Sequence, residues 1–357
     1  MKNKISKNYF LNVSYQLFSL LVPLFVTPYV SRVLGVEQIG IYSYTYSNMR
    51  YFWILSILGI GTFGVKIIGQ YSDNKYELSK AFFNVQLFKT IISSLLITLY
   101  FIFATFLFEN TKLYYIESLY LFSVMLDISW FFQGIEKYGV ITIKNFLIKI
   151  LSVICIFLFV KKESDFNLYV FFLSVFAFAG NLFLWPSLIG KIEKVHLSDI
   201  KPFSKIYTIP IIQLFFPTIA SQIFAILDKS FIGWITHSNY ENGIYEQAFK
   251  IIEMCIMIIS ALSIVKIPSI TRFYKNQEDE KIKETMNDSY NFVLFIGLPI
   301  LFGLFAISSI FVPIFFGDGY DGAVYLIYVL SSLIIFTGMQ QTIGNQFMIP
   351  TENQQRY

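Results

Sequence analysis

Ten apolar stretches of about 20 residues or more run through almost the whole of this 357-residue sequence. The hydrocarbon core of a bilayer is about 30 Å thick, and an α-helix needs about 20 apolar residues to cross it. Because that core holds no water, a spanning segment must satisfy its own backbone hydrogen bonds, which favours helices. The pattern predicts an all-α polytopic membrane protein. The expected spans are residues 9–30, 39–63, 81–107, 113–135, 139–160, 167–189, 206–227, 243–267, 290–316 and 321–345.

The composition excludes several other classes of protein. Charged residues make up 14% of the chain, whereas soluble domains carry about 25%. The net charge of +4 is small, so we expect no nucleic-acid partner. Cys155 and Cys255 both lie in apolar stretches, and no disulfide framework is expected. The first apolar run follows three lysines without a small-residue cleavage site, which predicts an uncleaved anchor helix.

The basic residues indicate how the chain is oriented. With the N-terminus placed in the cytoplasm, 17 Lys and Arg residues fall in inside segments, 5 in outside segments and 5 within spans. Basic residues are retained on the cytoplasmic side. The sequence therefore predicts a multi-pass protein with a cytoplasmic N-terminus.

A weak internal repeat indicates two bundles. The sequence GIY at 40–42 recurs at 243–245, an offset of 203 that also pairs Gly134 approximately with Gly338. We expect an N-terminal six-helix bundle at 1–189, a cytoplasmic linker at 190–205 and a C-terminal bundle at 206–357. These parallel repeats would surround a central cavity. The second bundle has only four expected spans, so we expect it to be incomplete and the chain to be truncated.

Charged residues inside the spans are costly in lipid and are the main candidates for function. At 1.5 Å per residue, Lys89, Asp127 and Lys149 lie about 12–15 Å from the cytoplasmic helix ends. Arg50 lies about 16 Å from the outside end, near the same level. This level predicts a water-filled cationic cavity that binds substrate through Arg50, Lys89, Lys149, Asp127 and Gln133. The alternative is that Asp127 neutralises one lysine while long side chains such as Lys144 reach the surface.

The expected second bundle carries acidic candidates instead. Glu253 lies near the midplane, and either binds a coupling proton or sodium ion or pairs with a cation of the first bundle. Glu246 and Lys250 are spaced i,i+4 and can satisfy one another. Asp228 completes these candidates for ion coupling or charge balance. No cofactor is expected beyond such Na⁺ or H⁺ coupling.

The sequence contains no motif of a soluble enzyme in the structural setting that the motif needs. Gly59, Gly61 and Gly64 have the dinucleotide-binding spacing, but they end a membrane helix and follow no strand. No metal-ligand spacing or Ser-His-Asp arrangement is evident, so we expect no metal and a protein that is not an enzyme.

Five short strings resemble one family. They are PYVSRVLG at 28–35, GIY at 40–42, WFFQGIE at 130–136, DKSFIG at 228–233 and GIYEQA at 243–248. Together they are similar to the bacterial flippases for capsule and O-antigen repeat units, within the multidrug/oligosaccharidyl-lipid/polysaccharide exporter superfamily. The resemblance implies transport of undecaprenyl-diphosphate-linked oligosaccharides across the bacterial cytoplasmic membrane, with the bilayer and other polysaccharide-assembly proteins as partners. A fork-shaped guanidinium suits phosphate oxygens, which makes Arg50 the first choice for the diphosphate.

Three other functions remain open at this point. A drug or organic-cation antiporter of the same superfamily would share the architecture but needs an acidic site. A membrane glycosyltransferase or polymerase would need a long outer loop, and the longest one expected is 228–242. A scaffold without transport activity is the third alternative.

Overall fold

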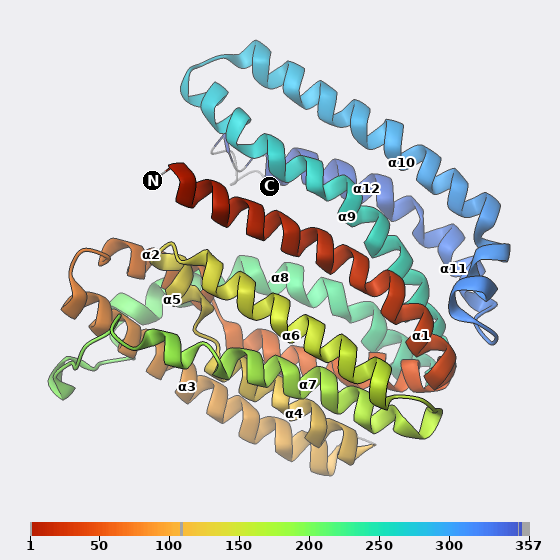
Figure 1. Ribbon diagram of the computed structural model, residues 1–357, viewed down its shortest axis with the longest axis horizontal. Coiled ribbons are helices and arrows are strands. Elements are labelled where there is room, and N and C mark those ends of the chain that lie inside the picture. Colours follow the sequence, from red (N-terminus) through yellow and green to blue (C-terminus); the bar gives the residue numbers. More distant parts are fainter. Residues whose placement is uncertain (1, 108–109, 349, 352–357) are drawn as a thin grey trace. The chain divides into compact units, whose positions relative to one another are not determined.

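The computed structural model describes residues 2–107, 110–348 and 350–351, of which residues 2–13, 16–17, 20, 216–218, 220–221, 224–225 and 261–265 are described by their backbone only. The described chain contains helices and no strand. The α-helices are α1 (Lys2–Ile57), α2 (Ile60–Gln70), α3 (Lys75–Phe106), α4 (Thr111–Leu126), α5 (Ser129–Gly134), α6 (Tyr138–Phe159), α7 (Phe166–Leu182), α8 (Lys205–Thr236), α9 (Asn239–Lys275), α10 (Asp279–Phe316), α11 (Gly322–Leu330) and α12 (Ser332–Gln341) (Figure 1). Short turns complete them: η1 (Glu163–Asp165), η2 (Trp185–Leu188), η3 (Leu197–Asp199) and η4 (Thr342–Met348).

The prediction of an all-α polytopic membrane protein is confirmed. Seven helical stretches among the described residues are long and apolar enough to cross a membrane. The first, Leu21–Gln70, contains both expected spans 9–30 (in part) and 39–63, separated by a break at Gly35 with φ 76° and ψ 169°, a backbone that glycine adopts readily. The expected spans 206–227 and 243–267 lie in α8 and α9, whose side chains are only partly described. The count of ten spans stays a prediction.

Two expected loops are wrong. The outer loop expected at 228–242 is mostly helix, because α8 continues to Thr236 and α9 begins at Asn239. The segment 268–289, left as an inside loop between the expected spans 243–267 and 290–316, is also mostly helix, with three residues between α9 and α10. Hydropathy marks where a helix leaves the bilayer, whereas a helix with polar residues continues into water as long as its backbone stays hydrogen-bonded.

The chain divides into two compact units. The first contains Met1–Val26 and Ile41–Asn239, and the second contains Thr27–Gly40 and Tyr240–Tyr357. By this division α8 belongs to the first unit, whereas the sequence places residues 206–357 in a second bundle. The predicted boundaries therefore remain a prediction.

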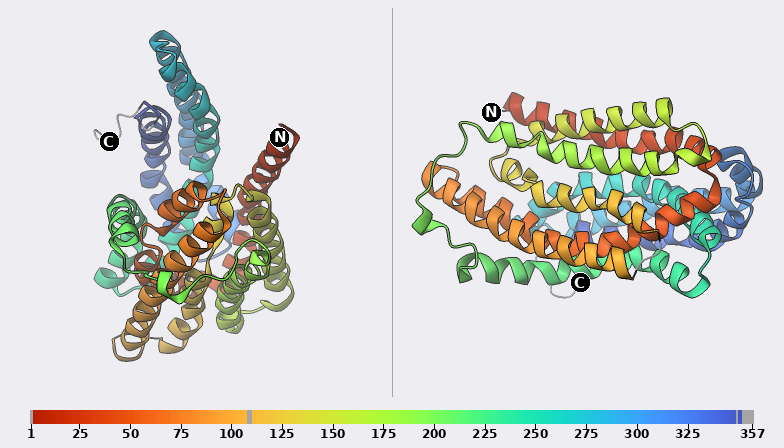
Figure 2. Two further views of the ribbon diagram at one scale, coloured as in Figure 1. Left: turned by 90° about the vertical axis from the view of Figure 1, so that its left-hand side faces the viewer. Right: turned by 90° about the horizontal axis from the view of Figure 1, so that it is seen from below.

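The first unit is built from helical hairpins. α3 packs on α4, α4 on α7 and α7 on α6, while the short α2 packs on α5 (Figure 2). Phe18 of α1 stacks on Phe146 of α6 with ring centroids 4.4 Å apart. Buried aromatic rings fill the end near α2 and α5, where Phe82, Trp130 and Phe131 are in mutual contact. These contacts bring α4, α6 and α7 together, and the Phe18–Phe146 stack places α1 beside α6.

The second unit packs α10 against α11 and α12. Ile252, Val312, Phe316 and Ala323 belong to its buried core. The 27–40 segment of α1 joins this unit through Ser31, whose hydroxyl oxygen accepts from Gln247 Nε2 at 3.0 Å and whose carbonyl oxygen accepts from the Tyr320 hydroxyl at 3.2 Å.

The segment 190–205, expected to be a linker, is hydrogen-bonded along α3. The Glu193 amide donates to Ser79 Oγ at 2.9 Å, and the Asn84 side chain donates to the Asp199 carbonyl oxygen at 3.1 Å. The Tyr76 hydroxyl donates to Asp199 Oδ2 at 2.7 Å. This segment is therefore part of the first unit.

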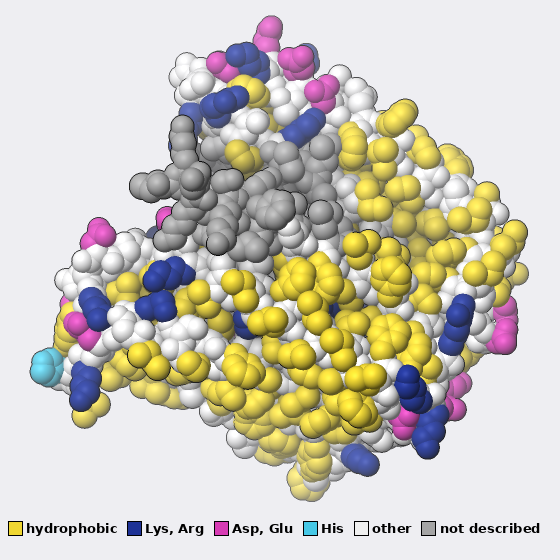
Figure 3. Space-filling model, in the orientation of Figure 1, with side chains coloured by type: hydrophobic (Ala, Val, Ile, Leu, Met, Phe, Trp, Pro, Cys, Tyr) yellow, Lys and Arg dark blue, Asp and Glu magenta, His cyan; other side chains and the backbone are white. Residues whose placement is uncertain are grey.

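Side-chain types on the surface agree with a bilayer. Hydrophobic side chains cover the middle of the face over α6 and α7, and Lys, Arg, Asp and Glu gather toward its two ends (Figure 3). Leu147, Leu158 and Phe183 are among the exposed large apolar residues there. Such a surface suits lipid, because lipid chains solvate apolar side chains that water would not.

Candidate functional site

The first unit contains a polar cavity of about 390 Å³ between α1, α4, α6 and α7. This volume is in the range of small-molecule sites, about 300–1,000 Å³. The side chains that matter for its chemistry are Tyr46, Arg50, Trp53, Tyr120, Ser123, Asp127, Lys144, Asn145, Lys149, Phe176 and Asn181. Three of the five residues predicted to bind substrate, Arg50, Asp127 and Lys149, therefore line one cavity.

Arg50 is half-buried and held by two neighbours. Its Nη2 donates to Gln222 Oε1 of α8 at 3.1 Å, and its Cζ lies 4.0 Å from the centroid of the Trp53 ring. Its Nε is buried and has no hydrogen-bond partner among the described residues. A buried donor without an acceptor is unfavourable, and an acceptor oxygen of a bound ligand would remove that cost.

Asp127 lies where the fourth expected span breaks. α4 ends at Leu126, Asp127 adopts an extended backbone, and Asp127 Oδ1 accepts from the Ser129 amide at 2.9 Å where α5 begins. The break leaves carbonyl oxygens without helical donors. Side chains replace those donors: Gln86 donates to the Met125 carbonyl at 2.8 Å, Trp185 to Leu126 at 2.9 Å and Lys89 to Asp127 at 2.7 Å.

Lys89 is thereby separated from the cavity. Only 3% of the residue is exposed, and it is not among the lining residues. Its ammonium group satisfies the Asp127 carbonyl behind the cavity wall. A role in substrate binding stays a prediction, and the contacts show a structural one.

Lys144 lies in the cavity wall, whereas the alternative interpretation of the sequence placed its charged end at the surface. Its Nζ donates to Asn181 Oδ1 at 3.1 Å. Asn181 Nδ2 in turn donates to the carbonyl and the hydroxyl oxygen of Ser123, at 3.0 and 2.9 Å. This network fixes one wall of the cavity and ties α6 and α7 to α4.

The cavity has a surplus of positive charge. Arg50, Lys144 and Lys149 line it against the single carboxylate of Asp127, a surplus of two. The predicted surplus was also two, but with Lys89 in place of Lys144. Charges in a partly buried site act more strongly on a ligand than charges on the open surface. The cavity therefore favours an anion.

The remaining predicted residues lie elsewhere. Gln133 is on α5 and does not line the cavity. Asp228 is exposed on α8. In the second unit Glu246 Oε1 and Lys250 Nζ form the expected i,i+4 ion pair at 3.6 Å. Glu253 is exposed and lies about one turn after Lys250 on α9. No group of three or more His, Cys, Asp or Glu that could hold a metal occurs in the part of the chain that is described.

Sequence reasoning missed Glu117, Trp53 and Asn181. Trp53 follows Arg50 by three residues, a spacing that places both on one helix face. Asn181 has no sequence signal that distinguishes it from other polar residues in a span. Glu117 was available as an ionisable residue in the expected span 113–135, and its burial is described below.

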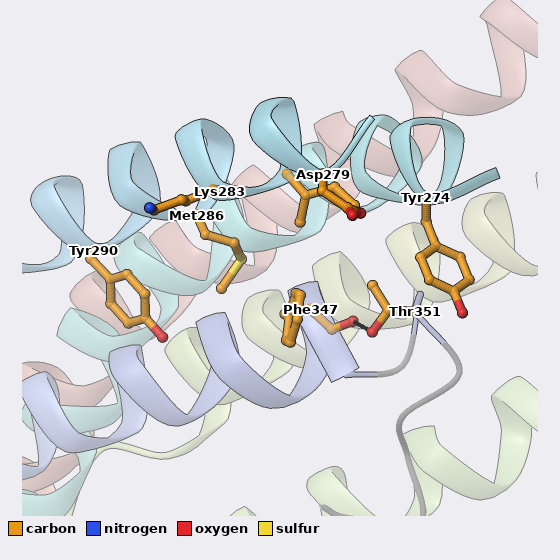
Figure 4. Close-up of a pocket in the computed structure, with 8 residues that line it drawn as sticks. Tyr274, Asp279, Lys283, Met286, Tyr290, Phe347 and Thr351 are labelled. Carbon is orange, nitrogen blue, oxygen red and sulfur yellow. Dashed lines mark hydrogen bonds between the residues drawn. The ribbon is translucent and has the colours of Figure 1, made fainter. Parts of the chain in front are cut away.

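The second unit has a pocket of about 500 Å³ (Figure 4). It lies between α10 and the end of η4, with Tyr274 of α9 at one edge. Asp279 and Lys283 are its charged lining residues, so the pocket has no surplus charge. It offers less for recognition of a charged ligand than the cavity of the first unit.

Comparisons with known proteins agree on one family. A family profile described as "Polysaccharide biosynthesis protein" matches residues 5–274. A protein of Escherichia coli (strain K12) named "Putative O-antigen transporter" is 24% identical over 347 residues, which cover 92% of this chain and 80% of that protein. A Haloferax volcanii protein named as a probable low-salt glycan biosynthesis flippase is 22% identical over 36% of this chain and 27% of that protein.

Solved structures of MATE transporters show a similar fold. A crystal structure of MATE in complex with Br-NRF is similar with a TM-score of 0.51 and 14% identity, covering 96% of this chain and 94% of that one. At this identity the likeness concerns the fold alone.

Proposed function

Because the chain belongs to the polysaccharide biosynthesis protein family, we propose that it is a flippase that carries polyprenyl-diphosphate-linked oligosaccharides across the cytoplasmic membrane. The names of the Escherichia coli and Haloferax volcanii relatives support transport of a glycan rather than an enzymatic reaction. We further propose that the lipid carrier is a polyprenyl diphosphate, which in bacteria is undecaprenyl diphosphate.

One observation carries the proposal: Arg50 faces a cavity with two surplus positive charges and keeps a buried Nε without an acceptor. A diphosphate brings acceptor oxygens and negative charge, and guanidinium groups bind such oxygens in pairs. Lys144 and Lys149 would hold the second phosphate. Hydroxyl and amide groups of Tyr46, Tyr120, Asn145 and Asn181 are suited to sugars, while the prenyl tail stays in lipid.

The test is transport of a labelled lipid-linked oligosaccharide in proteoliposomes. Arg50→Ala should lower the transport rate by roughly 10- to 100-fold, because a hydrogen bond to a charged group contributes about 1.5–3 kcal/mol. Arg50→Lys should restore part of the rate, since the charge returns but the paired donors do not. Lys112→Ala removes the same charge from an exposed position on α4 and is the matched control. Equal rates for Arg50→Ala and the control would refute the assignment.

A second candidate is export of organic cations. The cavity also contains the rings of Tyr46, Trp53, Tyr120 and Phe176 beside Asp127. Aromatic faces and a carboxylate together can bind a lipophilic cation. The charge surplus opposes this function, and a comparison of anionic and cationic substrates in proteoliposomes separates the two.

A further inference from the structure

Glu117 is an acidic side chain sealed inside the first unit. It lies on α4 and is 0% exposed. Its Oε1 accepts from the Thr45 hydroxyl of α1 at 2.8 Å, while Oε2 is buried and has no hydrogen-bond partner in the described part of the chain. Among the described residues no Lys or Arg forms a salt bridge with it. An ionised carboxylate in this position would lose its hydration and gain one hydrogen bond, whereas the neutral acid loses far less.

Neutral phenols are the titratable groups around it. Tyr100 of α3 and Tyr120 of α4 interact with it directly, and Tyr114 of α4 lies against Tyr100. Tyr42 and Tyr46 of α1 and Tyr169 of α7 lie around Tyr120. Several are already engaged, since the Tyr100 hydroxyl donates to the Tyr114 carbonyl at 2.8 Å and the Tyr114 hydroxyl accepts from Asn48 at 3.0 Å. This surrounding offers no cation to stabilise a negative charge on Glu117.

The acid is adjacent to the substrate cavity but outside it. Tyr120, one turn further along α4, lines the cavity, and its hydroxyl lies 3.3 Å from that of Tyr42. Thr45, which bonds Glu117, is little more than one turn from Arg50 on α1. A shift of α1 against α4 would therefore change the surroundings of Glu117 and of Arg50 together.

We propose that Glu117 is the proton-exchange site that couples helix movement in the first unit to transport, an inference that rests on the proposed function. Glu117 carries a proton in the packed state described here. When α1 and α4 separate and water enters, the Oε2–H bond breaks, the proton passes to water and the electron pair stays on the carboxylate. Repacking of the helices requires the proton to return. A proton gradient thereby favours one direction of the helix movement.

The first experiment measures transport in proteoliposomes with and without a pH gradient. Glu117→Gln keeps the shape and neutrality of the acid and the hydrogen bond from Thr45, so the protein should fold. We expect it to lose stimulation by the pH gradient. Glu163→Gln, an exposed acid in η1, is the matched control and should keep the stimulation. Equal stimulation of both variants would assign Glu117 a purely structural role and overturn the proposal.

A second experiment needs no transport substrate, so it separates failure of this inference from failure of the proposed flippase activity. A hydrophobic carbodiimide modifies protonated carboxyl groups, and mass spectrometry locates the adduct. We expect the purified wild type to be labelled at Glu117 at neutral pH, with labelling falling as the pH rises. Absence of the adduct at low and neutral pH would contradict the proposal. Protection by Na⁺ at constant pH would replace the proton with a sodium ion and equally overturn it.

Discussion

Lys89 is a buried cation whose ammonium group replaces a missing helix hydrogen bond. The break between α4 and α5 frees the Asp127 carbonyl, and Lys89 Nζ donates to it at 2.7 Å. Long side chains reach such positions because their methylene groups pack among apolar neighbours while the charged end finds a polar atom. This contact stabilises the end of α4 that presents Asp127 to the cavity.

We predict that Lys89→Met lowers the free energy of unfolding by about 1–3 kcal/mol, the cost of leaving a buried carbonyl without a donor. The measurement is thermal or denaturant unfolding of the purified protein in detergent. Lys112→Met, on the exposed first turn of α4, is the control and should leave the midpoint unchanged. Unchanged stability of Lys89→Met combined with weaker substrate binding would instead support the role predicted from the sequence.

Position along a helix could be predicted from the sequence, but the direction of each side chain could not. Arg50, Asp127 and Lys149 were placed at one level, and they line one cavity. Lys144 lines the cavity and Lys89 does not, and their hydrogen bonds explain the difference. Lys89 donates to the carbonyl freed by the break after α4, while Lys144 donates to Asn181 of α7. The break at Asp127 has no proline or glycine to announce it, so neither contact follows from the sequence.

Glycines of α2 show how one motif acquires a packing role. A Cβ at Gly64 would lie 2.7 Å from Cδ2 of Trp130, whereas a Cβ at Gly61 would meet nothing within 4 Å. The small residue lets α2 approach α5 closely, which explains one glycine of the dinucleotide-like spacing without any nucleotide. The close approach belongs to the core that supports the broken end of α4.

Gly64→Ala should destabilise the protein by about 1–3 kcal/mol, because the methyl group overpacks against a rigid indole ring. Gly61→Ala on the same helix should stabilise it by up to about 1 kcal/mol, since alanine favours helix and the site is open. Unfolding midpoints of the two variants in detergent provide the measurement. If both variants shift in the same direction, the packing argument fails.

The segment 190–205 allows a prediction about pH at the level of an element. The hydrogen bond from Tyr76 holds the pKa of Asp199 below its ordinary value. A carboxyl whose folded pKa is lowered contributes stability above its unfolded pKa and loses it as the pH falls through the folded value. The protection factors of residues 193–201, which compare the observed exchange rates with the intrinsic rates at the same pH, should therefore be constant from pH 8 to about 5 and fall below about pH 4.

Tyr76→Phe removes the donor, so the pKa of Asp199 should return toward its ordinary value. Protection at 193–201 should then be weaker above the acid transition, and the transition itself should move to higher pH. Tyr138→Phe changes a tyrosine on the exposed start of α6 and serves as the control. Identical exchange in the two variants would show that the other bonds along α3 hold the segment without Tyr76.

For the elements, the apolar cores of helices could be predicted and their ends could not. The expected span 139–160 matches α6 within a residue at each end. α9 and α10 instead extend past the expected spans, since residues such as Arg272 and Glu284 keep helical hydrogen bonds outside the apolar region. Hydropathy contains no information on that extension, and tertiary contacts rather than composition place the segment 190–205 on α3.

At the scale of the whole molecule, the bias of basic residues predicts a cytoplasmic N-terminus. Glu163→Cys, in the turn between α6 and α7, should react with a membrane-impermeant maleimide in intact cells, and Gln277→Cys, between α9 and α10, only after permeabilisation. Both variants are made with Cys155 and Cys255 replaced by serine. The reverse pattern of labelling would invert the orientation.

The net charge of the cavity distinguishes between the two proposed classes of substrate. Arg50, Lys144 and Lys149 against Asp127 leave a surplus of two positive charges. One charge pair at 4 Å and an effective dielectric constant of 20 contributes about 4 kcal/mol before desolvation is subtracted, so even part of this surplus should discriminate anions from cations. We predict that proteoliposomes transport a polyprenyl-diphosphate oligosaccharide and not a lipophilic cationic dye.

Lys149→Glu makes the net charge of the cavity zero, so transport of the lipid-linked sugar should fall sharply and uptake of the dye should rise. Lys162→Glu makes the same change in an exposed outer segment and should alter neither. Dye transport by the wild type without movement of the lipid-linked sugar would favour the cation exporter instead. A positively charged cavity should repel the dye, so this result would also show that the charge of the cavity does not select the substrate.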